Sequence, residues 1–245
     1  MSENTESPRA FRLPFRLYAK YHDEVAVSEA LATQYVSLNK TIPVPTILDV
    51  MKDNDKTFFL MTQVPGRPFG RRGTLVKMSD TQTSVLEETM RDWIAQVRVL
   101  PPPPNDAVCG FLGTSFQSFR LDYTRRIEPF DSVDTFHNQR SLTLPPTAPP
   151  GIQSLAARVR SRRHRLCFTH GDISPDNILA DENCKPVGLV DWECAAWMPE
   201  YWELTATVVR RQSYRPWMEV FKRIFPQYRE ELAVEIELWK TACPF

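Results

Sequence analysis

Two neighbouring segments decide the fold of this chain. The first is FTHGDISPDNILA at residues 168–180, and the second is PVGLVDWE at residues 186–193. Each contains a short apolar run of the kind found in β-strands, NILA at the end of the first and PVGLV at the start of the second. The residues between them, DENCK at 181–185, are typical of a turn. We therefore predict a β-hairpin whose strands are residues 177–180 and 186–190.

The predicted hairpin gathers three oxygen-bearing side chains. Antiparallel pairing brings Asn177, at the start of the first strand, beside Asp191, which follows the second. An amide oxygen and a carboxylate with open positions between them suit Mg²⁺ and the phosphates of a substrate. Asp172 lies on the loop that enters the hairpin, from where it could accept a proton from an attacking hydroxyl. This layout predicts phosphoryl transfer, with Asp172 as the base and with Asn177 and Asp191 as metal ligands.

The same residues resemble those of a known enzyme family. His170-Gly171-Asp172 stands where protein kinases have H-R-D, and Asp191-Trp192-Glu193 stands where they have D-F-G. The combination HGDxxxxN with a downstream DWE is similar to the aminoglycoside phosphotransferase and choline kinase-like enzymes, especially a fungal branch. The resemblance extends over residues 17 to 205. Further segments that carry it are IPVP at 42–45, LMTQVPG at 60–66, PFDS at 129–132 and PEYWE at 199–203.

The resemblance implies an α+β, protein kinase-like fold of two lobes. Residues 1–64 would form a reduced N-terminal nucleotide-binding lobe, and residues 65–245 a mainly helical C-terminal catalytic and substrate lobe. It also implies ATP and Mg²⁺ as cofactors, and a hydroxylated small molecule, with a cationic one as an option, as the phosphate acceptor. His170 is expected to orient the catalytic loop through hydrogen bonds rather than to act as the base.

A kinase-like lobe needs a strand lysine for the nucleotide phosphates and a helix glutamate that fixes this lysine. Lys20 ends a strand predicted at 17–20, and Glu29 lies in a helix predicted at 24–39. These two residues are the best pair for nucleotide binding. Glu24 is an alternative partner, and chance placement of exposed charges is a third interpretation.

The start of the chain departs from the family pattern. None of the 8 glycines precedes Gly66, so no glycine-rich loop and no phosphate-covering hairpin is expected before Lys20. Two hypotheses follow: a short but active ATP-dependent phosphotransferase, or a non-catalytic, pseudokinase-like binding or regulatory protein. The joint presence of Asp172, Asn177 and Asp191 favours chemistry, because a scaffold has no physical need for all three.

Several other residues allow two interpretations. Helices are predicted at 79–100, 201–211 and 216–240. Glu200 and Glu203 would lie one turn apart on a helix, either as an internally paired acidic face or as a subsite for a cationic substrate. Three aromatic residues fit either the core or a cage for a quaternary ammonium: Trp197, Tyr201 and Trp202. Trp192 is expected to pack, and Glu193 could reach a metal or an amine.

Bulk properties exclude some functions. The 30 basic and 30 acidic residues balance, so nucleic acid and an anionic membrane are not expected as partners, and the arginines of 158–165 fit a solvated helix face better than a nucleic-acid patch. The five cysteines show no C-x-x-C pair. No apolar run is long enough to span a membrane, and residues 1–7 do not resemble a signal peptide. We therefore expect a cytoplasmic protein.

Overall fold

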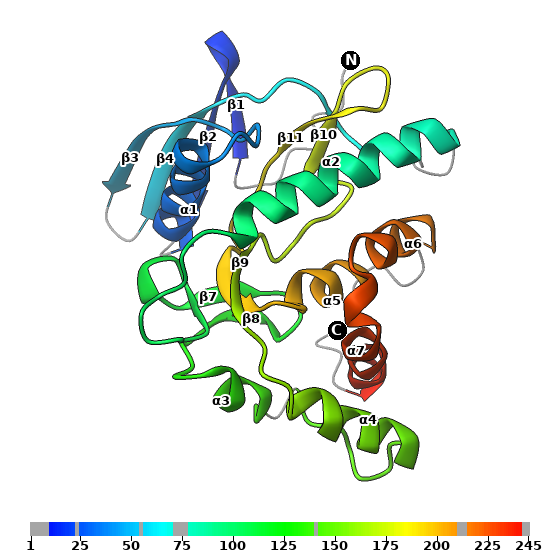
Figure 1. The fold of residues 1–245 in the computed structure, drawn as a ribbon. Coiled ribbons are helices and arrows are strands. Elements are labelled where there is room, and N and C mark those ends of the chain that lie inside the picture. Colours follow the sequence, from blue (N-terminus) through cyan, green and yellow to red (C-terminus); the bar gives the residue numbers. More distant parts are fainter. Residues whose placement is uncertain are drawn as a thin grey trace.

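The computed structural model shows a small lobe of strands with one helix and a larger lobe that is mainly helical (Figure 1). It describes residues 10–22, 25–53, 56–70, 78–139, 142–209 and 215–241. The small lobe lies at the upper left of Figure 1, and helices α3 to α7 fill the lower part. The predicted α+β class with two lobes is therefore confirmed.

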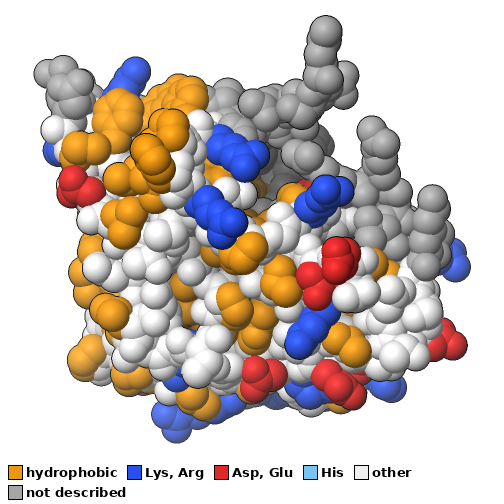
Figure 2. All heavy atoms as spheres, turned by 90° about the horizontal axis from the view of Figure 1, so that it is seen from above, with side chains coloured by type: hydrophobic (Ala, Val, Ile, Leu, Met, Phe, Trp, Pro, Cys, Tyr) orange, Lys and Arg blue, Asp and Glu red, His pale blue; other side chains and the backbone are white. Residues whose placement is uncertain are grey.

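The small lobe is one antiparallel sheet of four strands in the order β1-β2-β4-β3. The elements are β1 (Ala10–Leu13), β2 (Leu17–His22), β3 (Ile47–Asp53), β4 (Lys56–Thr62) and α1 (Val25–Asn39). Helix α1 covers one face, where Ala30 packs on Phe59. On the other face Phe11, Tyr21 and Phe58 stack on one another, and exposed apolar side chains gather over this lobe on the left of Figure 2.

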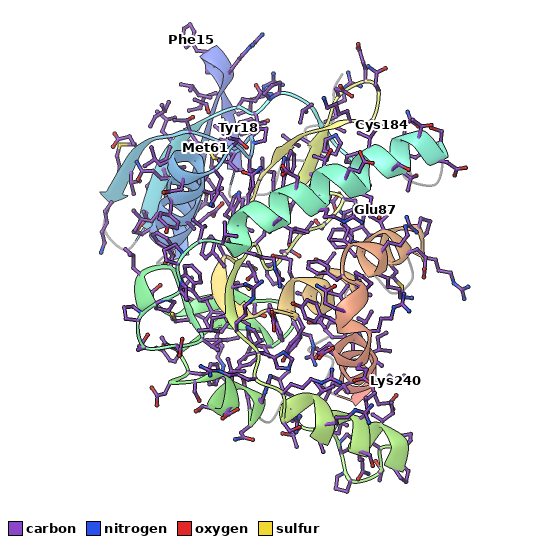
Figure 3. All side chains as sticks on the ribbon, viewed as in Figure 1. Phe15, Tyr18, Met61, Glu87, Cys184 and Lys240 are labelled. Atoms are coloured by element: carbon purple, nitrogen blue, oxygen red, sulfur yellow. The ribbon has the colours of Figure 1, made fainter. Side chains whose placement is uncertain are left out.

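A short hairpin that contains no glycine precedes Lys20. Strands β1 and β2 pair through a short turn at Pro14–Arg16. Phe15 and Arg16 adopt positive φ angles of 62° and 59°, so non-glycine residues make this turn. Phe15 projects at the top of the small lobe in Figure 3 and is 93% exposed. The turn contacts Gln63, whose backbone nitrogen donates to the Arg16 carbonyl at 2.7 Å. The turn therefore lies beside the residue that follows β4, and Arg16 is four residues before Lys20 in the sequence.

Short sheets organise the larger lobe. The predicted hairpin forms from β10 (Ile178–Ala180) and β11 (Pro186–Leu189), with Ile178 opposite Leu189, and β5 (Arg67–Pro68) adds a third strand. A second sheet has the order β6-β12-β9. Its strands are β6 (Cys109–Gly110), β9 (Leu166–Thr169) and β12 (Ala196–Pro199), and β7 (Phe116–Ser118) pairs separately with β8 (Asp122–Ile127). Strand β9 leads directly into residues 170–177, the loop that the sequence analysis predicts to be catalytic and that is called the catalytic loop below.

Helices make up most of the rest of the larger lobe. They are α2 (Asp80–Arg98), α3 (Val133–His137), α4 (Pro150–Arg160), α5 (Trp202–Val209), α6 (Arg215–Ile224) and α7 (Arg229–Thr241). Helix α2 begins with a capping box between Ser79 and Gln82 and contacts β9, β11 and α6. The single helix predicted at 216–240 is wrong. Pro226 cannot continue a helix, so α6 ends at Ile224 and a 3-10 turn at Pro226–Tyr228 leads into α7.

The larger core runs through both lobes. It joins Val36 of α1 and Ile42 to the buried residues of the larger lobe, among them Phe168 and Trp192. Tyr35 of α1 contacts the rings of Phe111 and Phe168, which ties the small-lobe helix to the strand that enters the catalytic loop. In the part of the chain that the structure describes, no helix is long and apolar enough to cross a membrane.

Candidate active site

The hairpin of β10 and β11, which the sequence analysis predicts to be the catalytic hairpin, brings together the residues expected from the sequence. The backbone nitrogen of Val190 donates to the carbonyl of Asn177 at 2.9 Å, so Asn177 lies beside the end of the second strand and next to Asp191. The Asn177 Nδ2 atom donates to the backbone carbonyl of Asp172 at 2.9 Å and to its Oδ2 at 3.2 Å. Because the amide nitrogen is used in this way, the amide oxygen is the atom that Asn177 would offer to a metal.

Lys20 forms an ion cluster with three carboxylates. Its Nζ atom donates to Glu29 Oε1 at 2.9 Å and to Asp191 Oδ1 at 2.7 Å, and it lies 3.8 Å from Glu193 Oε2. The pairing of Lys20 with Glu29 is as predicted. Its extension to Asp191 and Glu193 joins the small-lobe sheet and helix to the end of the catalytic hairpin.

Charge and burial oppose each other in this cluster. Burial lowers the pKa of Lys20, but Glu29, Asp191 and Glu193 more than compensate, so its pKa is raised above the ordinary value. Burial raises the pKa of Glu29, and the carboxylates of Asp191 and Glu193 add to this rise, while Lys20 opposes it. The single ammonium of Lys20 therefore has more carboxylates around it than it can neutralise. Because its pKa is raised, Lys20 stays protonated throughout the neutral pH range.

His170 has the structural role that the sequence predicts. Its Nε2 lies 3.0 Å from the carbonyl of Val190, and the backbone nitrogen of Asp172 donates to its Nδ1 at 3.3 Å. Burial lowers the pKa of His170 to about 4, although the hydrogen bond to Val190 opposes this shift. A neutral imidazole with its proton on Nε2 satisfies both bonds. The ring therefore connects the catalytic loop to the second strand of the hairpin.

Glu203 anchors the catalytic loop, a role that sequence analysis did not identify. Its carboxylate accepts hydrogen bonds from the backbone nitrogens of His170 at 2.7 Å and Gly171 at 3.1 Å. Burial raises the pKa of Glu203 to about 7, although these two bonds oppose the rise. One signal was present in the sequence: Glu203 is the only charged residue of the segment WELTATVV. In the structure every residue of this helix is buried, so the acid requires an internal partner.

Both the backbone conformation and the lack of space for a side chain require a glycine at position 171. Its φ is +78°, and an added Cβ would lie 2.4 Å from the carbonyl oxygen of Cys194. This close approach brings the DWE segment against the backbone just before Asp172. No other residue type fits this position without moving one of the two segments.

The aromatic residues near the site belong to the core. Trp197, Tyr201 and Trp202 are 5%, 6% and 1% exposed, so they cannot form a cage for a ligand cation. Trp192 is buried as predicted and packs against His170 and Phe168. The hypothesis of an aromatic cage is therefore wrong, and the interpretation as core is correct.

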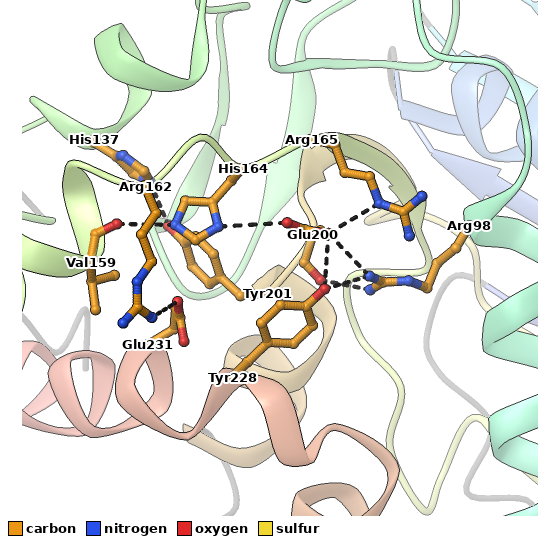
Figure 4. Close-up of polar contacts among 10 residues, drawn as sticks. All are labelled: Arg98, His137, Val159, Arg162, His164, Arg165, Glu200, Tyr201, Tyr228 and Glu231. Carbon is orange, nitrogen blue, oxygen red and sulfur yellow. Dashed lines mark hydrogen bonds and ion pairs between the residues drawn. The ribbon is translucent and has the colours of Figure 1, made fainter.

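Glu200 and Glu203 do not share a helix face, because α5 begins only at Trp202. Glu200 Oε2 accepts hydrogen bonds from Arg165 Nε and from the Tyr228 hydroxyl, both at 3.0 Å (Figure 4). Its backbone carbonyl accepts from Arg98 at 2.6 Å. Both carboxylates are thus engaged inside the protein, which fits paired acids rather than a cation subsite.

Among the arginines of residues 158–165, Arg158, Arg162 and Arg165 pair with acids, and Arg160 donates to the carbonyl of Leu142. Arg158 and Arg162 both form ion pairs with Glu230 at the start of α7, and Arg162 also pairs with Glu231. Helix α4 ends at Arg160, so the later arginines of the run lie beyond it. The run therefore joins α4 and the following loop to α7.

His137 forms a second buried imidazole, on the far side of Tyr201. Its Nε2 lies 2.8 Å from the Tyr201 hydroxyl, and the side chain is buried (Figure 4). Burial lowers the pKa of His137 to about 4, and His164 and Arg160 add to this shift. The folded protein therefore holds His137 neutral.

We predict that Gly171→Ala destabilises the protein more than Gly113→Ala. Gly113 has the same φ of +78°, but an added Cβ there meets nothing within 4 Å. Gly113→Ala should cost only the left-handed backbone, about 1–2 kcal/mol, whereas Gly171→Ala adds the clash with Cys194 and should cost roughly 2–4 kcal/mol. Urea denaturation of both variants measures the difference. Equal costs would show that the contact with Cys194 does not constrain the loop.

We also predict a pH dependence from His137. Its folded pKa lies near 4, below that of the unfolded chain, so the unfolded state binds an extra proton as the pH falls below about 6.5. Wild type should lose up to roughly 3 kcal/mol through this group between pH 7 and pH 4, and His137→Gln should not. The difference in unfolding free energy between the two proteins removes the contributions of all other groups. A difference that is constant from pH 7 to pH 4 would contradict the buried, neutral imidazole.

Solved structures similar to this one are kinases of small molecules. An aminoglycoside phosphotransferase from Streptomyces rimosus ATCC10970 matches with a TM-score of 0.58 and 19% identity, over 95% of this chain and 88% of that one. The GDP complex of an aminoglycoside 2'-phosphotransferase matches with a TM-score of 0.59 and 11% identity, over 96% of this chain and 79% of that one. A putative fructosamine-3-kinase from Haemophilus somnus 129PT matches with a TM-score of 0.57 and 12% identity, over 91% and 73% of the two chains. These likenesses confirm the kinase-like fold.

The family model agrees with the structural likeness. No curated protein matches the sequence. The model of the phosphotransferase enzyme family matches residues 4–236, nearly the whole chain. This chain therefore belongs to the phosphotransferase enzyme family.

Proposed function

We propose that this chain is an ATP-dependent phosphotransferase that acts on a hydroxyl of a small molecule. The observation that carries the proposal is the loop geometry, in which Asn177 holds the carboxylate of Asp172 at the entrance of a hairpin that ends in Asp191. Structural relatives were crystallised with ADP and streptomycin or with GDP and kanamycin, which supports a nucleotide and a hydroxylated acceptor here. We also propose that residues 1–64 form the nucleotide lobe and residues 65–245 the catalytic and substrate lobe.

Asp172 would orient the acceptor hydroxyl and take its proton. Asn177 supports this role because its amide nitrogen fixes the orientation of the carboxylate. Such positioning of a base typically contributes a factor of about 10²–10⁴ to the rate. Glu203 and Gly171 would act indirectly, since they hold the backbone that carries Asp172.

Lys20 would bind the nucleotide phosphates, and Glu29 would keep it in place. In the structure Lys20 also holds Asp191, so phosphates would replace that carboxylate as its partner. The donor set fits Mg²⁺, because Asn177 and Asp191 supply hard oxygen atoms. When bound there, Mg²⁺ would neutralise charge on the phosphates.

That the acceptor is cationic is still a prediction. Its support is that structural relatives were crystallised with streptomycin and with kanamycin. Glu200, Glu203 and the aromatic residues considered for a cation subsite are engaged or buried. A cytoplasmic location is likewise a proposal.

A second candidate is a non-catalytic, pseudokinase-like protein. One observation favours it: the hairpin before Lys20 has no glycine, and its turn contacts Gln63. Nucleotide binding would then be weak or absent.

We predict that Mg-ATP stabilises the protein against thermal unfolding. A ligand that binds only the folded state at 100 times its Kd adds about 2.7 kcal/mol to stability. Asp191→Asn should abolish this gain, because the neutral amide removes the charge that the metal needs. We choose Asn because Asp191 has a φ of 68°, which asparagine tolerates.

The matched control is Glu182→Ala, an exposed acid in the turn at the other end of the same hairpin. It should keep the full stabilisation by Mg-ATP. If millimolar Mg-ATP fails to stabilise the wild-type protein, the proposed function is wrong.

A further inference from the structure

Four consecutive prolines follow helix α2. Residues 99–106 read VLPPPPND and connect the end of α2 to β6. Each proline has a fixed φ of about −65°, and helical geometry is disfavoured for each residue before a proline. Leu100 to Pro103 are therefore extended, as in a polyproline II helix, and the structure places residues 101–103 in neither a helix nor a strand. The run ends in a turn, where the Asp106 nitrogen donates to the Pro103 carbonyl at 3.2 Å.

The exposure of this run repeats every third residue. A polyproline II helix has three residues per turn, so residues i and i+3 lie on the same edge. Leu100 is 5% exposed and Pro103 is partly buried, so the edge that they share faces the protein. Pro101 and Pro104 share a second edge, Pro102 lies on the third, and all three of these prolines are exposed. The run therefore presents two of its three edges to solvent.

Both ends of the run are fixed to the protein. The Leu100 nitrogen donates to the Val97 carbonyl at 3.1 Å, and after the turn Ala107 and Val108 are only 5% and 0% exposed. Val108 also pairs with Phe130 through two backbone hydrogen bonds of 2.9 Å. A partner would thus find the extended conformation already formed and would lose little free energy to ordering it.

An exposed and preformed polyproline II run is the ligand of one class of protein domain. SH3, WW and EVH1 domains bind such runs in grooves lined with aromatic side chains. Proline rings fill these grooves, and the backbone of four prolines has no N–H, so it offers carbonyl acceptors alone. Val99, which is 72% exposed, extends the apolar surface at the start of the run.

The charges beside the run favour one type of partner. Arg98 precedes the run, but its side chain is only 10% exposed and donates to the Glu200 carbonyl and to the Tyr228 hydroxyl. Asp106 follows the run and is exposed. The charge that these two flanking residues present to a partner is therefore negative, which is complementary to a groove with a basic rim.

We propose that residues 99–106 form a docking ridge for a proline-recognition domain of the EVH1 type, with an aromatic groove and a basic rim. Pro101, Pro102 and Pro104 would enter the groove, and Asp106 would face the rim. None of these residues belongs to the proposed active site, so the docking ridge does not depend on the function proposed above.

Calorimetric titration of the full chain with a purified EVH1 domain tests the proposal. The wild type should bind, and the double variant Pro101→Ala/Pro104→Ala should bind at least about tenfold more weakly, because both rings of one exposed edge are lost. The matched control is Pro146→Ala, at an exposed proline in another loop, which should bind as the wild type does. The proposal is overturned if the wild type does not bind at about 1 mM domain, or if the double variant binds equally well; the run is then only a rigid connection.

A second variant tests the charge and leaves every proline in place. Asp106 has a φ of 51°, which asparagine tolerates, so Asp106→Asn should keep the shape of the ridge. It should weaken binding of the EVH1 domain about threefold at low ionic strength, and the difference should shrink as salt is added. A purified SH3 domain with an acidic rim should bind the wild type at least about tenfold more weakly than the EVH1 domain does. Equal binding of Asp106→Asn and wild type at low salt, or equal binding of the two domains, would contradict a partner with a basic rim.

Discussion

The arrangement of the two lobes depends on one buried ammonium, that of Lys20, among three carboxylates. Lys20 comes from β2, Glu29 from α1, and Asp191 and Glu193 from the segment after the catalytic hairpin. Removal of one partner from a buried ion cluster leaves an uncompensated charge, which is strongly destabilising. The ion pairs of Lys20 therefore hold the small lobe against Asp191 and Glu193. The contact of Tyr35 with Phe168 adds apolar packing between the same two lobes.

The catalytic loop is held mainly by its backbone. Glu203 accepts two hydrogen bonds from the loop, and the absence of a side chain at Gly171 lets the Cys194 carbonyl approach closely. His170 then connects the loop to the second strand. Each interaction restrains the chain immediately before Asp172, so the carboxylate is positioned before any substrate binds. Preorganisation of this kind is how phosphoryl-transfer enzymes obtain most of their rate, because their chemistry relies on positioning and charge.

Local patterns predicted much of the site, and distant or unusual contacts explain the rest. The hairpin follows from two apolar runs around a polar turn, and the pair Lys20–Glu29 follows from a strand with a helix directly after it. The bond between Glu203 and the His170 nitrogen joins residues 33 positions apart, and periodicity carries no information about such a contact. The turn at Phe15 was missed because its left-handed residues are not glycine. The break at Pro226 was predictable from proline alone, but the amphipathic pattern on both sides concealed it.

The central claim is that Asp172 serves as the base in phosphoryl transfer from ATP. The most direct measurement is the release of labelled γ-phosphate from Mg-ATP, to water or to hydroxylated acceptors, by wild type and by Asp172→Asn. We expect slow turnover by wild type and a loss of at least about 100-fold in the variant, with nucleotide binding retained. Equal rates for the two proteins, or no turnover by wild type above the uncatalysed rate with any acceptor, would contradict the claim.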